Sequence, residues 1–192
     1  MTVADVPDRD FGELQEHDGK PTLRFVRRFP HPVDKVWRAI TEAEHVAAWF
    51  PCTIEGDFVA GGKLRFVFEE PGVDPIEGEM YAFDPPSLME FSWGEDVLRF
   101  ELRADGDGTV LDFSDTIVEY GKAARDGAGW HTCFDLLAHE VDGTAAPFTS
   151  VERWSQVHGT YKQRMGAEAS ALGPPEEWER AHGAEAEAAG DR

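Results

Sequence analysis

Between residues 53 and 118, apolar and polar residues alternate in short segments that turn residues separate. In one segment Leu98, Phe100 and Leu102 share one parity, while charged residues occupy the other. A period of two places these apolar side chains on one face of a strand, and tight turns such as the Gly-containing stretch 105–108 join antiparallel neighbours. The chain therefore predicts an antiparallel sheet with one face against a core and one face in water.

The expected strands cover residues 22–29, 53–58, 63–70, 75–84, 88–93, 97–104 and 109–118. Apolar residues at helical spacing predict two short helices directly after the first strand, at 32–41 and 44–50. The same spacing predicts longer helices at 125–143 and 149–165. Thr149 and Glu152 fit a capping box at the start of the last of these helices.

The helix expected at 125–143 has two unlike faces. One is an apolar stripe made of Trp130, Cys133, Phe134, Leu137 and Val141. The other carries His131, Asp135 and His139, and we expect it to lie in water. No metal is predicted here, because the eight residues from His131 to His139 span about 12 Å of helix, too far for one ion. Cys133 and His131 are two positions apart and do not face each other, so a thiol nucleophile is not expected.

Four stretches, in order along the chain, resemble one known superfamily. They are HPVDKVWRAITEAEHVAAWF, GGKLRF, EGEMYAFDPPSLMEFSWG and AGWHTCFDLL. The chain resembles the SRPBCC (START-like, helix-grip) superfamily, in the branch named after the activator of the heat-shock-protein-90 ATPase. The resemblance implies an α+β fold in which a curved antiparallel sheet of about six to seven strands wraps around a long C-terminal helix. It also implies two short helices after the first strand, and a cavity between sheet and helix that is usually lined by apolar residues.

In this fold, residues 21–165 form one domain that includes an extra C-terminal helix. Residues 1–20 are polar and are expected to form a flexible lead-in. The stretch 166–192 is rich in alanine and acidic residues and contains two adjacent prolines. We expect it to be a mobile or weakly helical acidic tail that buries little surface.

Apolar residues on the inward faces are the candidate ligand contacts, and an ordinary packed core is the alternative interpretation. Together with Asp115, the candidates are Trp49, Phe50, Phe66, Phe68, Met80, Phe91, Trp93, Phe100, Phe113, Trp130, Cys133, Phe134 and Leu137. Apolar pockets with few polar groups are typical of small-molecule sites.

Asp115 is the exception on an otherwise apolar face. It shares the parity of Leu111 and Phe113, so it points inward if they do, and a buried carboxylate must be paired or neutralised. Arg125 and His131 are candidate partners, and a place at the solvated rim of the sheet is the alternative. Many relatives in the resembling branch carry His at this point, so the aspartate is a departure from their pattern.

Charge and composition limit the kinds of molecule that the protein is expected to bind. With 18 basic and 38 acidic residues, the formal net charge is −20, which argues against nucleic acids and anionic membranes. No apolar run approaches a membrane span and the N-terminus lacks the pattern of a secretory signal. Two cysteines do not make a disulfide framework. We expect a cytoplasmic protein with reduced thiols and no cofactor.

These patterns and the resemblance together indicate that the chain binds a small, largely apolar molecule. Two other classes stay open. One is an enzyme similar to polyketide cyclases or dehydratases, with Asp115 or His131 as a general base in the same cavity. The other is an interaction protein similar to the chaperone activator, although the eukaryotic co-chaperone has a second, N-terminal domain for which this chain has no room. A homodimer is also left open.

Overall fold

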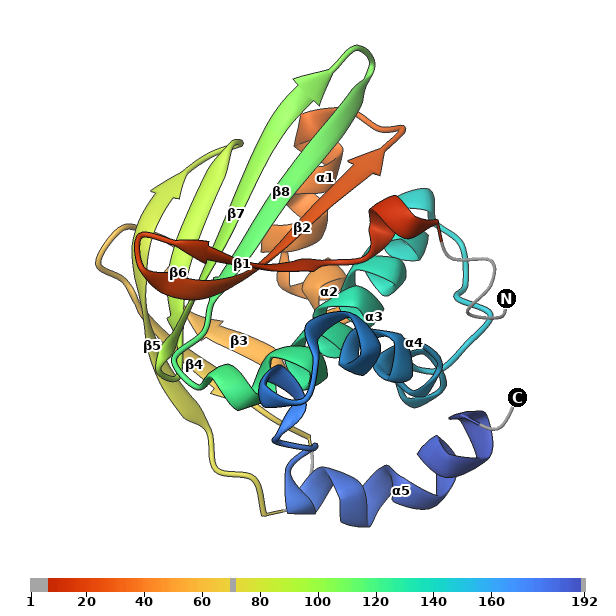
Figure 1. Ribbon diagram of the computed structural model, residues 1–192. Helices are drawn as coiled ribbons and strands as arrows, with labels where there is room; N and C mark the ends of the chain where they lie inside the picture. The colour runs from red at the N-terminus through yellow and green to blue at the C-terminus, as the bar shows by residue number, and fades with distance from the viewer. Residues whose placement is uncertain (1–6, 70–71, 191–192) are drawn as a thin grey trace.

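The computed structural model describes residues 7–69 and 72–190, and it has the expected α+β architecture (Figure 1). Eight antiparallel strands form one curved sheet in the order β1-β2-β8-β7-β6-β5-β4-β3. The strands are β1 (Glu13–His17), β2 (Lys20–Phe29), β3 (Thr53–Gly56), β4 (Lys63–Val67), β5 (Ile76–Asp84), β6 (Leu88–Trp93), β7 (Asp96–Asp105) and β8 (Gly108–Thr116). The predicted helix-grip sheet is thus confirmed, with one strand more than the expected six to seven.

The helices follow the predicted order. They are α1 (Val33–Thr41), α2 (Ala43–Val46), α3 (Ala123–Asp142), α4 (Ser150–Met165) and α5 (Glu176–Gly190), with short 3-10 helices at Asp8–Asp10, Tyr120–Lys122 and Glu168–Ser170. The capping box predicted for α4 is present, since Thr149 accepts from the Glu152 amide while the Glu152 side chain accepts from the Thr149 amide. The described residues contain no helix that is both long enough and apolar enough to cross a membrane.

The extra strand, β1, lies within the expected lead-in 1–20. It pairs with β2 through a hairpin whose turn residues Asp18 and Gly19 both have positive φ. Asp-Gly is favoured in such turns because both positions need left-handed backbone. Residues 13–17 are therefore part of the sheet and not a loose lead-in. Residues 1–6 of the expected lead-in and Glu70 of the expected strand 63–70 lie outside the described residues.

The inner face of the sheet is closed by aromatic rings. Neighbouring rings in a row across the sheet have centroids 4.7–6.1 Å apart; the row runs Phe25, Phe113, Phe100, Phe91 and Phe66. Phe134 of α3 packs on this row, 4.9 Å from Phe113 and 5.4 Å from Phe25. Apolar area buried in this way is the main stabilising term of the fold.

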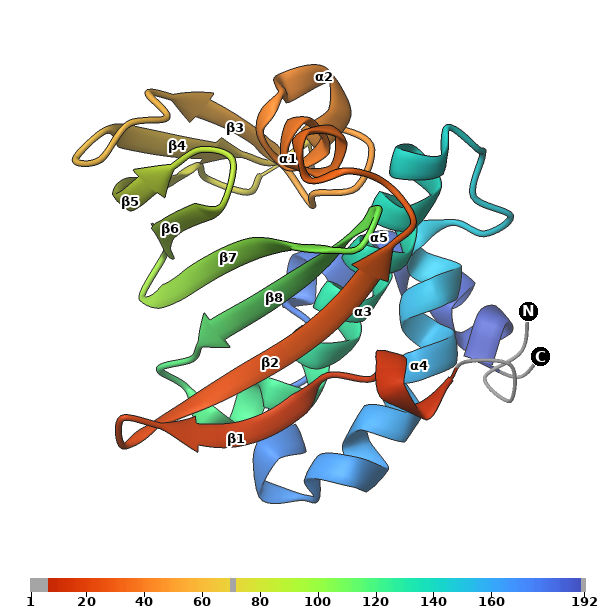
Figure 2. The same ribbon diagram turned by 90° about the horizontal axis from the view of Figure 1, so that it is seen from above.

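Helix α3 lies between the sheet and α4 (Figure 2). A glycine permits the close contact of the two helices, because a Cβ atom at Gly127 would lie only 2.9 Å from Cδ1 of the buried Tyr161. The expectation that His131, Asp135 and His139 face water is consequently wrong for the first two. His131 is fully buried and Asp135 is largely buried, since α4 covers this face of α3.

The C-terminal segment does not match the expected tail that buries little surface. Residues 176–190 form α5, whose Trp178 ring packs 4.9 Å from that of Trp154 on α4. Glu185 accepts a hydrogen bond from the Thr149 hydroxyl, and Ala189 is buried. Residues 191–192 of the expected tail lie outside the described part of the chain.

Candidate functional site

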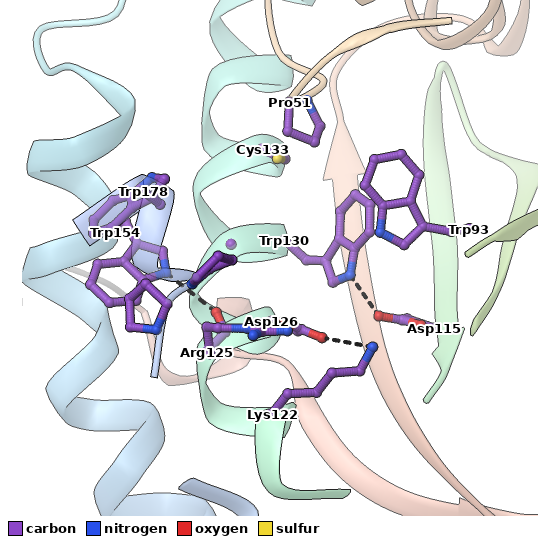
Figure 3. A pocket seen from close by; sticks show the side chains of 13 residues that line it. Pro51, Trp93, Asp115, Lys122, Arg125, Asp126, Trp130, Cys133, Trp154 and Trp178 are labelled. Atoms are coloured by element: carbon purple, nitrogen blue, oxygen red, sulfur yellow. Dashed lines mark hydrogen bonds and ion pairs between the residues drawn. The ribbon is translucent and has the colours of Figure 1, made fainter. Parts of the chain in front are cut away.

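A groove runs along the flank of α3 and consists of two adjacent lobes that share part of their lining. The inner lobe, of about 300 Å³, reaches the sheet at Trp93 and Asp115 (Figure 3). The outer lobe, of about 620 Å³, lies between α3, the corner that follows α2, and helices α4 and α5. The lobes share the lining residues Pro51, Gly129, Cys133, Trp154, Pro175 and Trp178. We refer to both lobes together as the groove.

Aromatic side chains line both lobes of the groove. Phe50 lies in the corner after α2, and its ring centroid is 5.4 Å from that of Trp93 and 5.9 Å from that of Trp130. At the opposite side Trp154 and Trp178 form a pair that belongs to both lobes. Flat apolar walls of this kind suit a hydrophobic or aromatic ligand.

Asp115 is the buried polar group at the inner end. It is 1% exposed, and its Oδ2 accepts a hydrogen bond of 2.8 Å from Trp130 Nε1 (Figure 3). Its Oδ1 has no hydrogen-bond partner among the described residues. Burial, followed by the nearby charges of Asp96 and Asp126, raises the pKa of Asp115 well above the ordinary range of a carboxyl. Burial therefore favours the neutral, protonated form of the Asp115 carboxyl group.

Asp115 belongs to a cluster of three carboxyl groups that the sequence pattern did not predict. Oxygens of Asp96, Asp115 and Asp126 lie within 4.8 Å of one another. The Lys122 ammonium bonds to Asp96 and lies 3.6 Å from Asp126, so it already supplies the cation that these two carboxylates require. The prediction of no metal concerned the helical positions His131, Asp135 and His139, whereas this cluster joins residues of β7, β8 and α3.

The expected partners of Asp115 are both elsewhere. Arg125 lines the inner lobe but donates to Asp126 at 2.7 Å and to the Gly173 carbonyl at 3.2 Å. His131 faces α4, where its Nδ1 lies 3.0 Å from the Tyr161 hydroxyl. Trp130 takes the place of both as the direct partner of Asp115.

His131 is part of a buried polar cluster between α3, α4 and β2, separate from the groove. Asp135 is its centre: it accepts a hydrogen bond of 2.6 Å from Arg153 Nε, and its other oxygen lies 3.9 Å from Arg27 Nη2. Burial lowers the pKa of His131, which favours the neutral ring. Asp115 and His131, the two candidate general bases, thus do not form one catalytic pair.

The fourteen expected ligand contacts divide into two groups. Those that line the groove are Trp49, Phe50, Phe68, Trp93, Asp115, Trp130 and Cys133. Those that the groove does not reach, and that are packed at 0–1% exposure in the core, are Phe66, Met80, Phe91, Phe100, Phe113, Phe134 and Leu137. Lining residues absent from the expected set include Lys122, Trp154 and Trp178. The two tryptophans were missed because α4 and α5 were not expected to border the cavity.

Cys133 lines both lobes as a buried thiol. Burial, and to a lesser degree the neighbouring Cys52, raises the pKa of Cys133 to about 12. Only the thiolate is a strong nucleophile, so we expect iodoacetamide to modify Cys133 in the folded protein far more slowly than in urea. Mass spectrometry of timed digests measures both rates, and equal rates would contradict this assignment.

The fold has known relatives among solved structures. CalU16 from Micromonospora echinospora is 21% identical with a TM-score of 0.62, and the match covers 81% of this chain and 94% of that one. Protein EF2215 from Enterococcus faecalis is 19% identical with a TM-score of 0.67, and the match covers 80% and 90% of the two chains. At these identities the similarity establishes the fold alone. No curated protein has significant sequence similarity to the chain.

A sequence family identifies the chain more specifically. The family described as "Activator of Hsp90 ATPase homolog 1-like protein" matches residues 30–142. The matched segment begins at the end of β2 and ends with α3, so it includes most of the sheet and the helix that borders the groove. The chain belongs to the family of activator of Hsp90 ATPase homolog 1-like proteins.

Proposed function

We propose that the protein binds a small, largely apolar molecule in the groove. The observation that carries this proposal is the groove itself, in which tryptophans line both lobes and the buried acid Asp115 lies at the inner end beside the paired charges of Lys122, Arg125 and Asp126. Ligand sites of proteins have volumes of about 300–1,000 Å³, mostly apolar walls and few polar groups. Both lobes fall in this range.

The proposed site differs from a cavity in the centre of the sheet. The phenylalanine row and Phe134 fill that region, so a ligand there would have to displace packed rings. The groove instead approaches the sheet from the flank of α3, near Trp93 and Asp115. A ligand in the inner lobe would lie between Trp178 and Asp115, outside the space that the phenylalanine row fills.

Titration with an uncharged solvatochromic dye tests this proposal. We expect saturable binding at one site, with a blue-shifted dye emission and quenching of tryptophan fluorescence, because tryptophans line both lobes. Native mass spectrometry of the protein and its complex gives the stoichiometry. Dye uptake that appears only in partly unfolded protein would contradict the proposal.

The pair of Trp154 and Trp178, which lines both lobes, supplies a second test of the proposal. Replacing Trp178 with Ala removes a ring that borders both lobes and packs on Trp154. We expect a loss of dye affinity of about threefold to tenfold, the range of an aromatic contact. Arg180→Ala is the matched control, since Arg180 is an exposed residue of the same helix and does not line the groove. Equal affinities of the two variants would exclude Trp178 from the site.

A further inference from the structure

The Asp115 carboxyl group has one oxygen that is already satisfied and one that is not. Oδ2 accepts from Trp130 Nε1, whereas the buried Oδ1 has no partner among the described residues. A neutral carboxyl group contains one acceptor oxygen and one hydroxyl donor. Since an indole N–H can only donate, the oxygen facing Trp130 is the acceptor, and the hydroxyl belongs at Oδ1.

We propose that the ligand carries an uncharged oxygen acceptor, a ketone or quinone carbonyl on a flat apolar frame, and that the Asp115 hydroxyl donates a hydrogen bond to it. This inference rests on the proposed function of the groove and names the class of molecule that fits it. A buried donor without a partner costs free energy, and a ligand carbonyl at the inner lobe would supply the missing acceptor. Asp115 would then determine specificity at the inner end of the groove.

The charged groups around Asp115 favour an uncharged partner. The carboxylates of Asp96 on β7 and Asp126 on α3 lie close to the Asp115 carboxyl group. The Lys122 ammonium contacts both carboxylates and balances one of their two negative charges. Arg125 also lines this lobe, and its hydrogen bond to Asp126 balances the second negative charge. With these charges paired, the part of the chain that the structure describes offers an anionic ligand no unpaired cation beside Asp115.

The shape of the inner lobe favours a flat frame. At its sheet end, the ring centroids of Trp93 and Trp130 lie 6.4 Å apart. Trp154 and Trp178 line its outer end. Aromatic rings gain from stacked or edge-to-face contacts with such walls. A molecule of a few fused rings would place its edge, where a carbonyl projects, near Asp115.

A matched pair of probes isolates the hydrogen bond. Methyl naphthyl ketone and isopropenylnaphthalene have the same planar frame, but a methylene group replaces the carbonyl oxygen in the second. Competition with the dye gives both affinities across neutral and alkaline pH. For the wild type we expect a ketone preference of about fivefold to tenfold. This preference should be lost as the pH rises through the pKa of Asp115, because the ionised group cannot donate.

Two substitutions of Asp115 separate donor from charge. Asp115→Asn can present its carbonyl to Trp130 and its amide N–H to the groove, so it should keep the ketone preference at every pH. Asp115→Leu has a similar shape and no donor, so it should bind the two probes equally while keeping its affinity for isopropenylnaphthalene. That retained affinity also shows that the variant is folded.

The outcomes distinguish this inference from the proposed function. If neither probe binds the wild type, the groove is not a ligand site and both proposals fail. If both probes bind the wild type equally, only the inference about Asp115 fails. A ketone preference that increases with pH, or that is the same in Asp115→Leu as in the wild type, would also overturn it. Should Asp115→Leu not fold, the comparison of Asp115→Asn with the wild type across pH decides.

Discussion

Replacing Asp135 with Ala is expected to lower the free energy of unfolding by about 3–5 kcal/mol, the usual cost of breaking a buried ion pair. Its carboxylate bonds to Arg153, which is 1% exposed, and lies 3.9 Å from Arg27, which is 7% exposed. Arg27 Nη1 and Nη2 have no hydrogen bond among the described residues, so charge attraction to Asp135 is a main compensation for burying them. The alanine variant would leave two buried guanidinium groups without this carboxylate.

Urea denaturation of Asp135→Ala and Asp112→Ala measures this effect against a matched control. Asp112 also pairs with an arginine, Arg24, but both side chains are about a third or more exposed. Exposed pairs contribute less than about 1 kcal/mol, so the control should be close to wild type. Similar losses in the two variants would contradict the role assigned to Asp135.

The same cluster predicts how the difference depends on pH. Burial alone would raise the pKa of Asp135, but His131, Arg153 and Arg27 outweigh burial and lower it. A carboxyl whose folded-state pKa is lowered stabilises the protein at neutral pH, and this contribution disappears as the pH falls through that pKa. The gap between wild type and Asp135→Ala should therefore narrow in acid.

Filling the groove at Gly129 is expected to have the largest effect on binding. Gly129 is a helical residue of α3 that lines both lobes, and a Cβ atom there would meet nothing within 4 Å. A leucine side chain can therefore extend into the space that the ligand needs. Overpacking costs about 1–3 kcal/mol, so the affinity for the dye should fall by about 10- to 100-fold. The substitution should stabilise α3 by about 0.5–1 kcal/mol, since leucine favours helix more than glycine.

Much of the fold could be predicted from local patterns. Strand alternation placed Leu98, Phe100 and Leu102 on one face, and all three are buried in the core. The parity of Asp115 with Phe113 left both an inward carboxyl and a place at the rim open, and the structure buries the group. These predictions succeed because a side chain's face in a strand depends on the backbone period alone.

The missing parts depend on contacts between distant segments. The spacing of His131 and Asp135 shows that they share a helical face, but whether a second helix covers that face depends on Gly127 and Tyr161. The carboxyl cluster joins Asp96 and Asp126, which are separated along the chain by the rest of β7, all of β8, a short 3-10 helix and the first turn of α3. Only long-range packing brings such residues together, and no local period records it.

Two local signals in the sequence point to packing that the periods of strands and helices do not record. The Asp18-Gly19 pair marks a hairpin turn between segments that form β1 and β2. Trp178 is a large aromatic residue within an acidic, alanine-rich stretch, and such a residue gains most from packing on a partner surface. Its ring packs on Trp154 and lines the groove, whereas the tail was expected to bury little surface.

The most direct test of the groove as a ligand site is the dye affinity of Gly129→Leu compared with Gly159→Leu. Gly159 is likewise a helical glycine whose Cβ would meet nothing within 4 Å, but it lies on the exposed side of α4 and outside the groove. Both variants gain the same helix propensity, so a general effect on stability cancels. We expect Gly159→Leu to bind the dye like the wild type and Gly129→Leu to lose binding while its melting temperature does not fall. Wild-type dye affinity in a folded Gly129→Leu variant would contradict the account.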